Sequence, residues 1–221
     1  MTVTADELFR RASTGLPCWM GRSDGTRDPL PTARWMGGAA SSIEDRDADN
    51  RMISQCAGPT LDLGCGPGRL TEGLARRGIS ALGVDTSREA VDLTVNRGGR
   101  AVLRDLFDPL PNAGEWECVL LADGNIGIGG DPVRLLRRAA ELLRPDGVVI
   151  AEVDSPGDAR VRQQTVRWET DTTVGDWFAW ASVSATATTG LAQAAGLTVV
   201  DIAPAHGRYF AYMRSAPVRE T

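Results

Sequence analysis

From residue 59 onward, short apolar runs alternate with segments whose apolar residues recur at helical spacing, and this alternation constrains the fold more than any other feature. The apolar runs occupy residues 59–63, 80–85, 100–105, 117–123 and 147–153. The helical segments between them lie at 69–78, 87–98 and 132–147. Strands that alternate with helices in this way form a parallel sheet covered on both faces. The sequence therefore predicts a doubly wound α/β domain.

Capping signals refine the helix ends. The pattern Thr86-x-x-Glu89 is typical of a capping box, and Asp131-Pro132 is typical of an N-cap followed by proline in the first helical position. Glycine is favoured just beyond a helix. The glycines expected to end the three helical segments are at 78, 98 and 147.

The segments on either side of this region do not show the alternation of strands and helices. Residues 4–13 and 44–57 indicate helices, and the intervening residues 15–42 are expected to form a loop packed against the domain. Beyond the fifth strand, residues 160–169 and 176–184 indicate an inserted antiparallel pair. A final helix and a closing hairpin are expected to follow, at 187–195, 197–204 and 208–215.

Charge and composition exclude several kinds of chemistry. The chain has 221 residues, of which 29 are acidic, and all 24 basic residues are arginine, which leaves a net charge of −5. Proteins that grip a phosphate backbone carry a basic surface, so this balance argues against a nucleic-acid partner. The lack of lysine excludes Schiff-base chemistry and a P-loop lysine.

Cysteine and histidine are sparse and scattered. A structural zinc site needs several closely spaced thiolate or imidazole ligands, and the chain has a single histidine, His206. We therefore expect no metal and four reduced thiols. The first residues carry no apolar signal segment, and no apolar run approaches the ~20 residues that span a bilayer. These observations predict a cytoplasmic protein that does not enter a membrane. The cysteines are at 18, 56, 65 and 118.

The sharpest motif is Leu61-Asp62-Leu63-Gly64-Cys65-Gly66-Pro67-Gly68, placed between the first strand and its helix. Glycines at such a turn let a ligand approach the positive end of the helix. A dinucleotide site requires GxGxxG, but Arg69 replaces its last glycine. Asp62 would repel a pyrophosphate and attract an ammonium group.

Acidic residues also end the next two strands. Asp85 can accept the two hydroxyls of a ribose, and its alternative role is to cap the helix that follows. Asp105 can accept an adenine amino group, with Leu106 beside the ring, and its alternative role is that of a turn aspartate.

Together these motifs resemble those of the class I S-adenosylmethionine-dependent methyltransferases. LDLGCGPG is similar to their first motif, GVDTS to their ribose loop and RDLFDPLP to their adenine loop. The resemblance covers residues 58–153 and implies a seven-stranded sheet whose last strand is antiparallel. It also implies a single domain with an N-terminal cap (1–57), a cofactor-binding half (58–155) and a substrate-side insertion with the closing hairpin (156–221).

The resemblance assigns a cofactor role to particular residues. Asp62 and Gly64 would hold the methionine end of S-adenosylmethionine, and Asp85 would take its ribose. The rest of the expected set comprises Cys65, Gly66, Gly68, Thr86, Asp105, Leu106 and Asp123. S-adenosylhomocysteine would be the product.

Five tryptophans concentrate in the two segments without a family match. They are expected either to wall a pocket for a small acceptor or only to pack these segments onto the sheet. His206, Asp123 and Asn125 are the candidate catalytic residues, and for His206 the alternative is an ordinary surface position. Asp154 could also orient a nucleophile. The five tryptophans are Trp19, Trp35, Trp168, Trp177 and Trp180.

The resulting functional hypothesis is methyl transfer to a hydroxyl, amine or carboxylate of a small molecule of secondary metabolism. An inactive cofactor-binding subunit is the first alternative. A nicotinamide-dependent dehydrogenase is the second, disfavoured by Asp62 and Arg69. The acceptor and the oligomeric state are left open.

Overall fold

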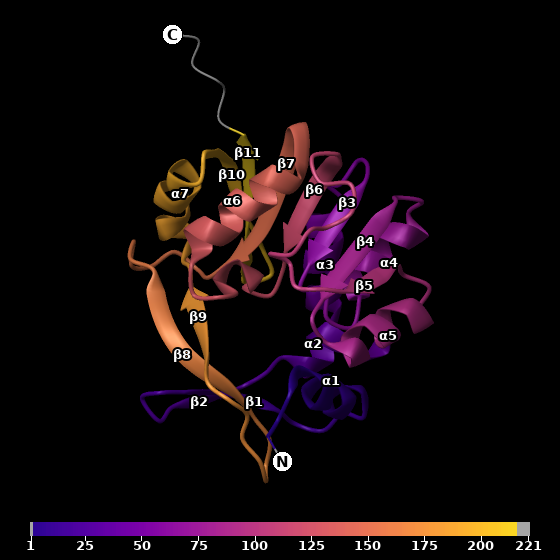
Figure 1. The fold of residues 1–221 in the computed structure, drawn as a ribbon, viewed down its shortest axis with the longest axis vertical. Helices are drawn as coiled ribbons and strands as arrows, with labels where there is room; N and C mark the ends of the chain where they lie inside the picture. The colour runs from indigo at the N-terminus through magenta and orange to yellow at the C-terminus, as the bar shows by residue number, and fades with distance from the viewer. Residues whose placement is uncertain (1, 216–221) are drawn as a thin grey trace.

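A seven-stranded sheet forms the centre of the protein, whose computed structural model describes residues 2–215 (Figure 1). Its strand order is β10-β11-β7-β6-β3-β4-β5. Strand β11 runs antiparallel to β10 and β7, and the remaining neighbours are parallel. The predicted doubly wound, mostly parallel sheet with an antiparallel last strand is confirmed. Its strands are β3 (Thr60–Leu63), β4 (Ala81–Asp85), β5 (Ala101–Leu103), β6 (Trp116–Leu121), β7 (Leu143–Val153), β10 (Leu197–Ala205) and β11 (Arg208–Ser215).

Helices cover both faces of this sheet and bury two apolar clusters. On one face α3 and α4 bury Met52 and Leu74 against β6 and β7, and α5 lies beside α4. On the other face α6 and α7 pack together, and Leu135 and Leu136 of α6 enter the larger cluster. The covering helices are α3 (Ile43–Ile53), α4 (Arg69–Arg76), α5 (Arg88–Asn96), α6 (Pro132–Leu142) and α7 (Ala185–Ala194).

A second sheet lies below the large one in Figure 1 and has the order β2-β1-β8-β9. The predicted inserted pair is present as β8 (Arg162–Glu169) and β9 (Phe178–Ser182). The prediction of a loop over 15–42 was wrong. This segment contains β1 (Trp19–Arg22), β2 (Arg27–Pro29), α2 (Thr32–Met36) and the 3-10 helix η1 (Gly38–Ala40), after helix α1 (Ala5–Ser13).

The first two strands escaped prediction because they are short and depend on a distant partner. Strand β1 has four residues, and Trp19 pairs with Glu169 across 150 positions of sequence. Gly21 interrupts its apolar pattern. A Cβ at Gly21 would lie 2.2 Å from Oε1 of Glu169, so the missing side chain is what lets Glu169 pack over this strand.

Of the helix ends that differ from their predicted positions, two have a clear local cause. Helix α6 ends at Leu142, and β7 begins at once, because Pro145 has no N–H to donate and disfavours helical geometry at Arg144. Gly147 therefore lies inside β7. The capping box at Thr86 was displaced by one residue, since Oγ of Ser87 accepts the Ala90 N–H at 3.2 Å.

Within residues 2–215, no helix is long and apolar enough to cross a membrane, and no group of three histidine, cysteine or acidic side chains could hold a metal ion. The four cysteines are buried free thiols.

Candidate functional site

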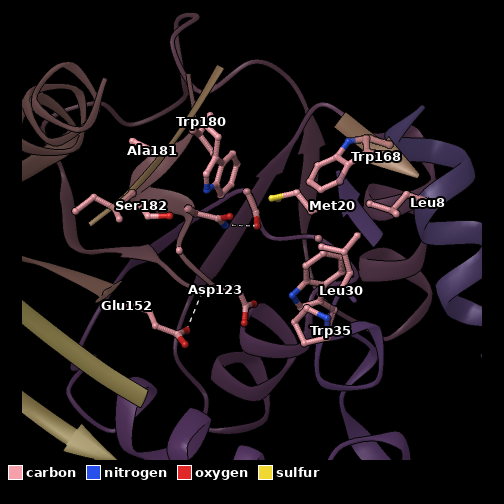
Figure 2. Close-up of a pocket in the computed structure, with 18 of the residues that line it drawn as sticks. Leu8, Met20, Leu30, Trp35, Asp123, Glu152, Trp168, Trp180, Ala181 and Ser182 are labelled. Atoms are coloured by element: carbon pink, nitrogen blue, oxygen red, sulfur yellow. Dashed lines mark hydrogen bonds between the residues drawn. The ribbon is translucent and has the colours of Figure 1, made fainter. Parts of the chain in front are cut away.

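A cavity of about 620 Å³ separates the carboxyl ends of the central strands from the four-stranded sheet. The glycine loop after β3 and the ends of β4, β6 and β7 form one wall. Helices α1 and α2 and one face of the four-stranded sheet form the other. Figure 2 shows Trp180, Met20 and Trp168 facing Asp123 and Glu152 across this space.

The glycine loop presents backbone to the cavity. Gly64 and Gly66 have φ angles of 72° and 52°, which favour glycine, and both line the cavity with Cys65. The N–H groups of Gly64 and Cys65 donate to the Val84 carbonyl of the neighbouring strand at 2.8 and 3.1 Å. The loop is thus fixed to the sheet before any ligand is bound.

Gly68 belongs to the same motif but does not line the cavity. It is the N-cap of α4 with φ 81°, and a Cβ there would lie 2.4 Å from Oγ1 of the buried Thr94. A glycine is required at this position because α4 and α5 pack closely there.

Asp85 joins the glycine loop to the start of α5. Its carboxylate accepts the Gly66 N–H and the Ser87 N–H, both at 2.9 Å, and lines the cavity beside Thr86. Burial raises the pKa of Asp85, and the two donated hydrogen bonds act in the opposite direction. The alternative role of helix cap falls to Ser87, so Asp85 instead holds the glycine loop to the start of α5 with a carboxylate that also faces the cavity.

Asp62 lies behind the loop. It is 2% exposed, accepts a hydrogen bond from Oγ1 of Thr71 at 2.9 Å and does not line the cavity. Desolvation raises the pKa of Asp62 to about 6. Burial likewise raises the pKa of the Cys65 thiol.

Asp105 and Leu106 are outside the cavity. Strand β5 ends at Leu103, and Asp105 accepts the Phe107 N–H at 2.8 Å, as a turn aspartate does. Leu106 is buried in the larger apolar cluster, and its carbonyl accepts Nε of Arg138 at 3.0 Å. The structure does not bring this pair to the other expected cofactor residues.

Asp123, by contrast, lies at the centre of a buried ion network that the sequence did not reveal. Nη1 of Arg69 donates to its Oδ2 at 2.6 Å, and Arg69 also donates to Asp49 at 2.8 and 3.1 Å. On the other side, the Asp123 N–H donates to Glu152, which accepts two hydrogen bonds from Arg208 at 2.8 and 2.7 Å. The sequence signal for Arg69 was its place directly after the glycines, where it also disfavours a dinucleotide site.

The second carboxylate oxygen of Asp123 is available to accept a hydrogen bond from a ligand. Oδ1 is buried and accepts no hydrogen bond within residues 2–215, and the nearest guanidinium nitrogens, on Arg34 and Arg208, are 3.9 and 4.0 Å away. Although burial opposes the charge, Arg69 and Arg208 hold the pKa of Asp123 below its usual range. Asp123 is therefore suited to accept from a cation and poorly suited to act as a general base.

Asn125 holds the loop in place. It opens the 3-10 helix η2 (Asn125–Gly127), and its Nδ2 donates to the carbonyls of Leu63 and Gly64 at 3.1 and 2.8 Å. It also lines the cavity.

Three of the five tryptophans reach the cavity: Trp35, Trp168 and Trp180. Trp19 and Trp177 do not line it. The guanidinium of Arg27 lies 4.1 Å from the Trp19 ring, and that of Arg167 lies 4.5 Å from Trp177.

His206 does not line this cavity. It lies in the turn between β10 and β11, half exposed, with Nε2 4.0 Å from Asp47. It lines a second, polar cavity of about 890 Å³, which shares Asp123, Asp154 and Ser182 with the first. Asp154 therefore lies where the two cavities adjoin.

The four-stranded sheet contributes cavity residues that sequence reasoning missed. They lie at alternate positions of three strands, the period of one sheet face. They are Met20, Arg22, Gln164, Phe178 and Ser182.

Comparisons with known proteins agree with this arrangement. The family described as "Methyltransferase domain" matches residues 47–202. A ubiquinone biosynthesis O-methyltransferase of Azorhizobium caulinodans is 35% identical over 95 residues, which are 41% of this chain and 38% of the relative. One from a Caulobacter species is 31% identical over 97 residues, again 41% and 38%. The match thus spans little more than a third of the length of these relatives.

Solved structures show the same fold over more of the chain. An S-adenosylmethionine-dependent methyltransferase from Bacteroides fragilis, in complex with S-adenosyl-L-homocysteine, superposes with a TM-score of 0.76 at 20% identity and covers 98% of both chains. The 1,6-didemethyltoxoflavin-N1-methyltransferase of Burkholderia thailandensis superposes with a TM-score of 0.58 at 20% identity and covers 79% of each.

Proposed function

This chain belongs to the family of methyltransferase domains, and from that premise we propose that it transfers a methyl group from S-adenosylmethionine to a small aromatic acceptor. The expected class I methyltransferase is confirmed at the level of family and fold. The observation that carries the proposal is the cavity itself, because the glycine loop and three tryptophans line the same space.

Residues of the cofactor wall fit S-adenosylmethionine. Oδ1 of Asp123 is a buried, ionised acceptor without a partner among the described residues, and an α-ammonium group would satisfy it. Asp85 lines the cavity next to the glycine loop, where each of its oxygens keeps a lone pair for a ribose hydroxyl. Bound there, S-adenosylmethionine supplies an activated methyl group on a sulfonium.

The protein's own contribution is to position the acceptor and exclude water. Transfer to a sulfonium methyl depends mainly on orientation and on a desolvated nucleophile. Trp35, Trp168 and Trp180 offer flat apolar faces for an aromatic ring. A small metabolite, such as one of secondary metabolism, fits a cavity of about 620 Å³.

His206 is not part of this proposal, since it lies outside the cavity. Asp123 is assigned to the cofactor instead of to catalysis, because its ion pairs keep it ionised. Asn125 is proposed to position the glycine loop through its two donated hydrogen bonds.

Titration calorimetry tests the proposal. We expect binding of S-adenosylhomocysteine and none of NAD, because Arg69 fills the position of the last dinucleotide glycine and is itself ion-paired with Asp49 and Asp123. Micromolar NAD binding without a response to S-adenosylhomocysteine would contradict the methyltransferase assignment. Binding without turnover of any ring acceptor would favour the alternative of an inactive partner subunit.

Asp85→Ala sharpens this test. Loss of a carboxylate that accepts ribose hydroxyls should weaken S-adenosylhomocysteine binding by about 2–4 kcal/mol. The variant should also unfold at a lower temperature, since the N–H groups of Gly66 and Ser87 lose their acceptor. The control is Asp92→Ala, an exposed carboxylate on α5. Equal affinity in both folded variants would restrict Asp85 to holding the glycine loop against the start of α5.

A further inference from the structure

A directed chain of hydrogen bonds crosses the four-stranded sheet on its cavity face. Arg22 of β1 forms a salt bridge with Asp28 of β2, and its Nε donates to Oε1 of Gln164 on β8 at 2.7 Å. Nε2 of Gln164 then donates to Oγ of Ser182 on β9 at 2.8 Å. The chain thus links all four strands of the sheet.

The direction of this chain follows from chemistry. A guanidinium can only donate, so the Gln164 atom that faces Arg22 must be the amide oxygen. The amide nitrogen is then left to face Ser182, and it too can only donate. Ser182 is consequently an acceptor within the chain, and its own hydrogen must go elsewhere.

The Ser182 hydroxyl hydrogen has no acceptor among the protein groups of residues 2–215. Ser182 lines both cavities, together with Asp123 and Asp154. It lies two residues beyond Trp180 on the same face of β9, so an aromatic ring against Trp180 would carry its substituent toward Ser182. The sheet therefore offers one oriented donor at the end of an apolar wall.

We propose that the cavity takes an aromatic ring whose oxygen substituent accepts the Ser182 hydroxyl hydrogen, and that this oxygen receives the methyl group. The proposal rests on the proposed function and narrows its acceptor to an aryl oxygen. Ser182 is the residue that contacts the acceptor, while Arg22 and Gln164 position its hydrogen.

Lone pairs distinguish an oxygen from a nitrogen acceptor here. A neutral amine has one lone pair, and a nitrogen that accepts from Ser182 has none left for the methyl group. A phenolate oxygen can accept from Ser182 and still form the new O–CH3 bond. The electron pair of the broken S–CH3 bond stays on sulfur, and the phenol proton leaves to solvent water before transfer.

The test compares two probes of one shape, 4-nitrophenol and 4-nitroaniline, titrated calorimetrically into the full chain with S-adenosylhomocysteine present. We expect 4-nitrophenol to bind about tenfold more tightly, the effect of one hydrogen bond to a charged group. Ser182→Ala should remove this preference and leave 4-nitroaniline binding within about twofold.

Gln164→Glu tests the direction of the chain. A carboxylate at position 164 accepts from Arg22 as before and also accepts the Ser182 hydrogen, which turns the hydroxyl away from the cavity. The phenol preference should be lost although Ser182 is retained. The control is Thr165→Ala, an exposed neighbour on the opposite face of β8, which should keep the preference.

Unchanged S-adenosylhomocysteine affinity in each variant confirms that it has folded. Equal binding of the two probes to the unaltered protein, or a preference that survives Ser182→Ala, would overturn the oxygen proposal and leave the methyltransferase assignment intact. Binding of S-adenosylhomocysteine with no binding of either ring would overturn both the oxygen proposal and the aromatic acceptor.

Discussion

The two walls of the cavity are built in different ways. The cofactor wall is centred on a turn of consecutive residues, Gly64–Pro67, whose backbone is fixed by Asp85 and Asn125. The acceptor wall consists largely of side chains from three strands, Trp19–Arg22, Arg162–Glu169 and Phe178–Ser182. Adjacent residues determine a local turn, whereas a wall of alternating side chains forms only when strands that are distant in sequence pair.

The largest expected effect tests whether the glycine motif of the cofactor wall tolerates a side chain. Gly68→Ala should lower the free energy of unfolding by about 2–5 kcal/mol, because it adds left-handed strain to an overlap with the buried Thr94. Urea unfolding followed by circular dichroism measures this loss.

Gly78→Ala is the matched control. Gly78 has a similar φ of 75° after α4, but nothing lies within 4 Å of a Cβ there. Gly78→Ala should therefore lower the free energy of unfolding only by the left-handed strain, about 1–2 kcal/mol. Equal losses for the two substitutions would show that Gly68 is a simple turn glycine, with no role in seating α4 on α5.

The contrast between the walls also explains what could be predicted from the sequence. Apolar runs and glycine turns are local, so the five parallel strands, the closing hairpin and the loop at Gly64–Gly66 could be predicted. Helix α6 was predicted too long, because its apolar spacing continues into Leu143 although Pro145 disfavours helical geometry at Arg144.

Residues of the acceptor wall could not be found in the same way. Arg22, Gln164 and Ser182 are ordinary polar residues in sequence, and their hydrogen bonds require three strands to pair in register. The tryptophans were conspicuous, but only the folded structure separates Trp168, which pairs with Met20 and lines the cavity, from Trp177, which precedes β9 and does not line it. Likewise, the ion pairs of Asp123 join residues 54 and 85 positions apart.

A second prediction concerns Asp62, the motif residue buried behind the cofactor wall. Its pKa is raised to about 6 in the folded protein from an ordinary value of 3.8. Between these values the folded state holds a proton that the unfolded state has released, so this group's contribution to stability falls as pH rises from about 4 to 6.

Asp62→Asn removes that titration and keeps an oxygen for the Thr71 hydroxyl. As pH rises from 4 to 7, the free energy of unfolding of the variant should increase relative to that of the unaltered protein by up to about 3 kcal/mol. Urea unfolding of both proteins across this range isolates Asp62 from the other carboxylates. If the two proteins differed in free energy of unfolding by the same amount at every pH, Asp62 would be ionised throughout this range and stabilised by Arg69.

The smallest expected effect tests whether the acceptor wall recognises a ring or only packs. Trp168 lines the cavity with its ring centroid 4.9 Å from that of Phe178, while Trp177 is 46% exposed and stacks with Arg167 outside it. An aromatic pair contributes about 0.5–1.5 kcal/mol beyond area burial, so Trp168→Ala should weaken 4-nitrophenol binding to the S-adenosylhomocysteine complex by about 2- to 12-fold. Trp177→Ala should leave that affinity within about twofold. Trp168→Phe should recover part of the loss, because a smaller ring still offers a face to the probe. Equal losses at both positions would instead mean that these tryptophans serve to hold the four-stranded sheet together, and the cavity would then have no aromatic recognition of its own.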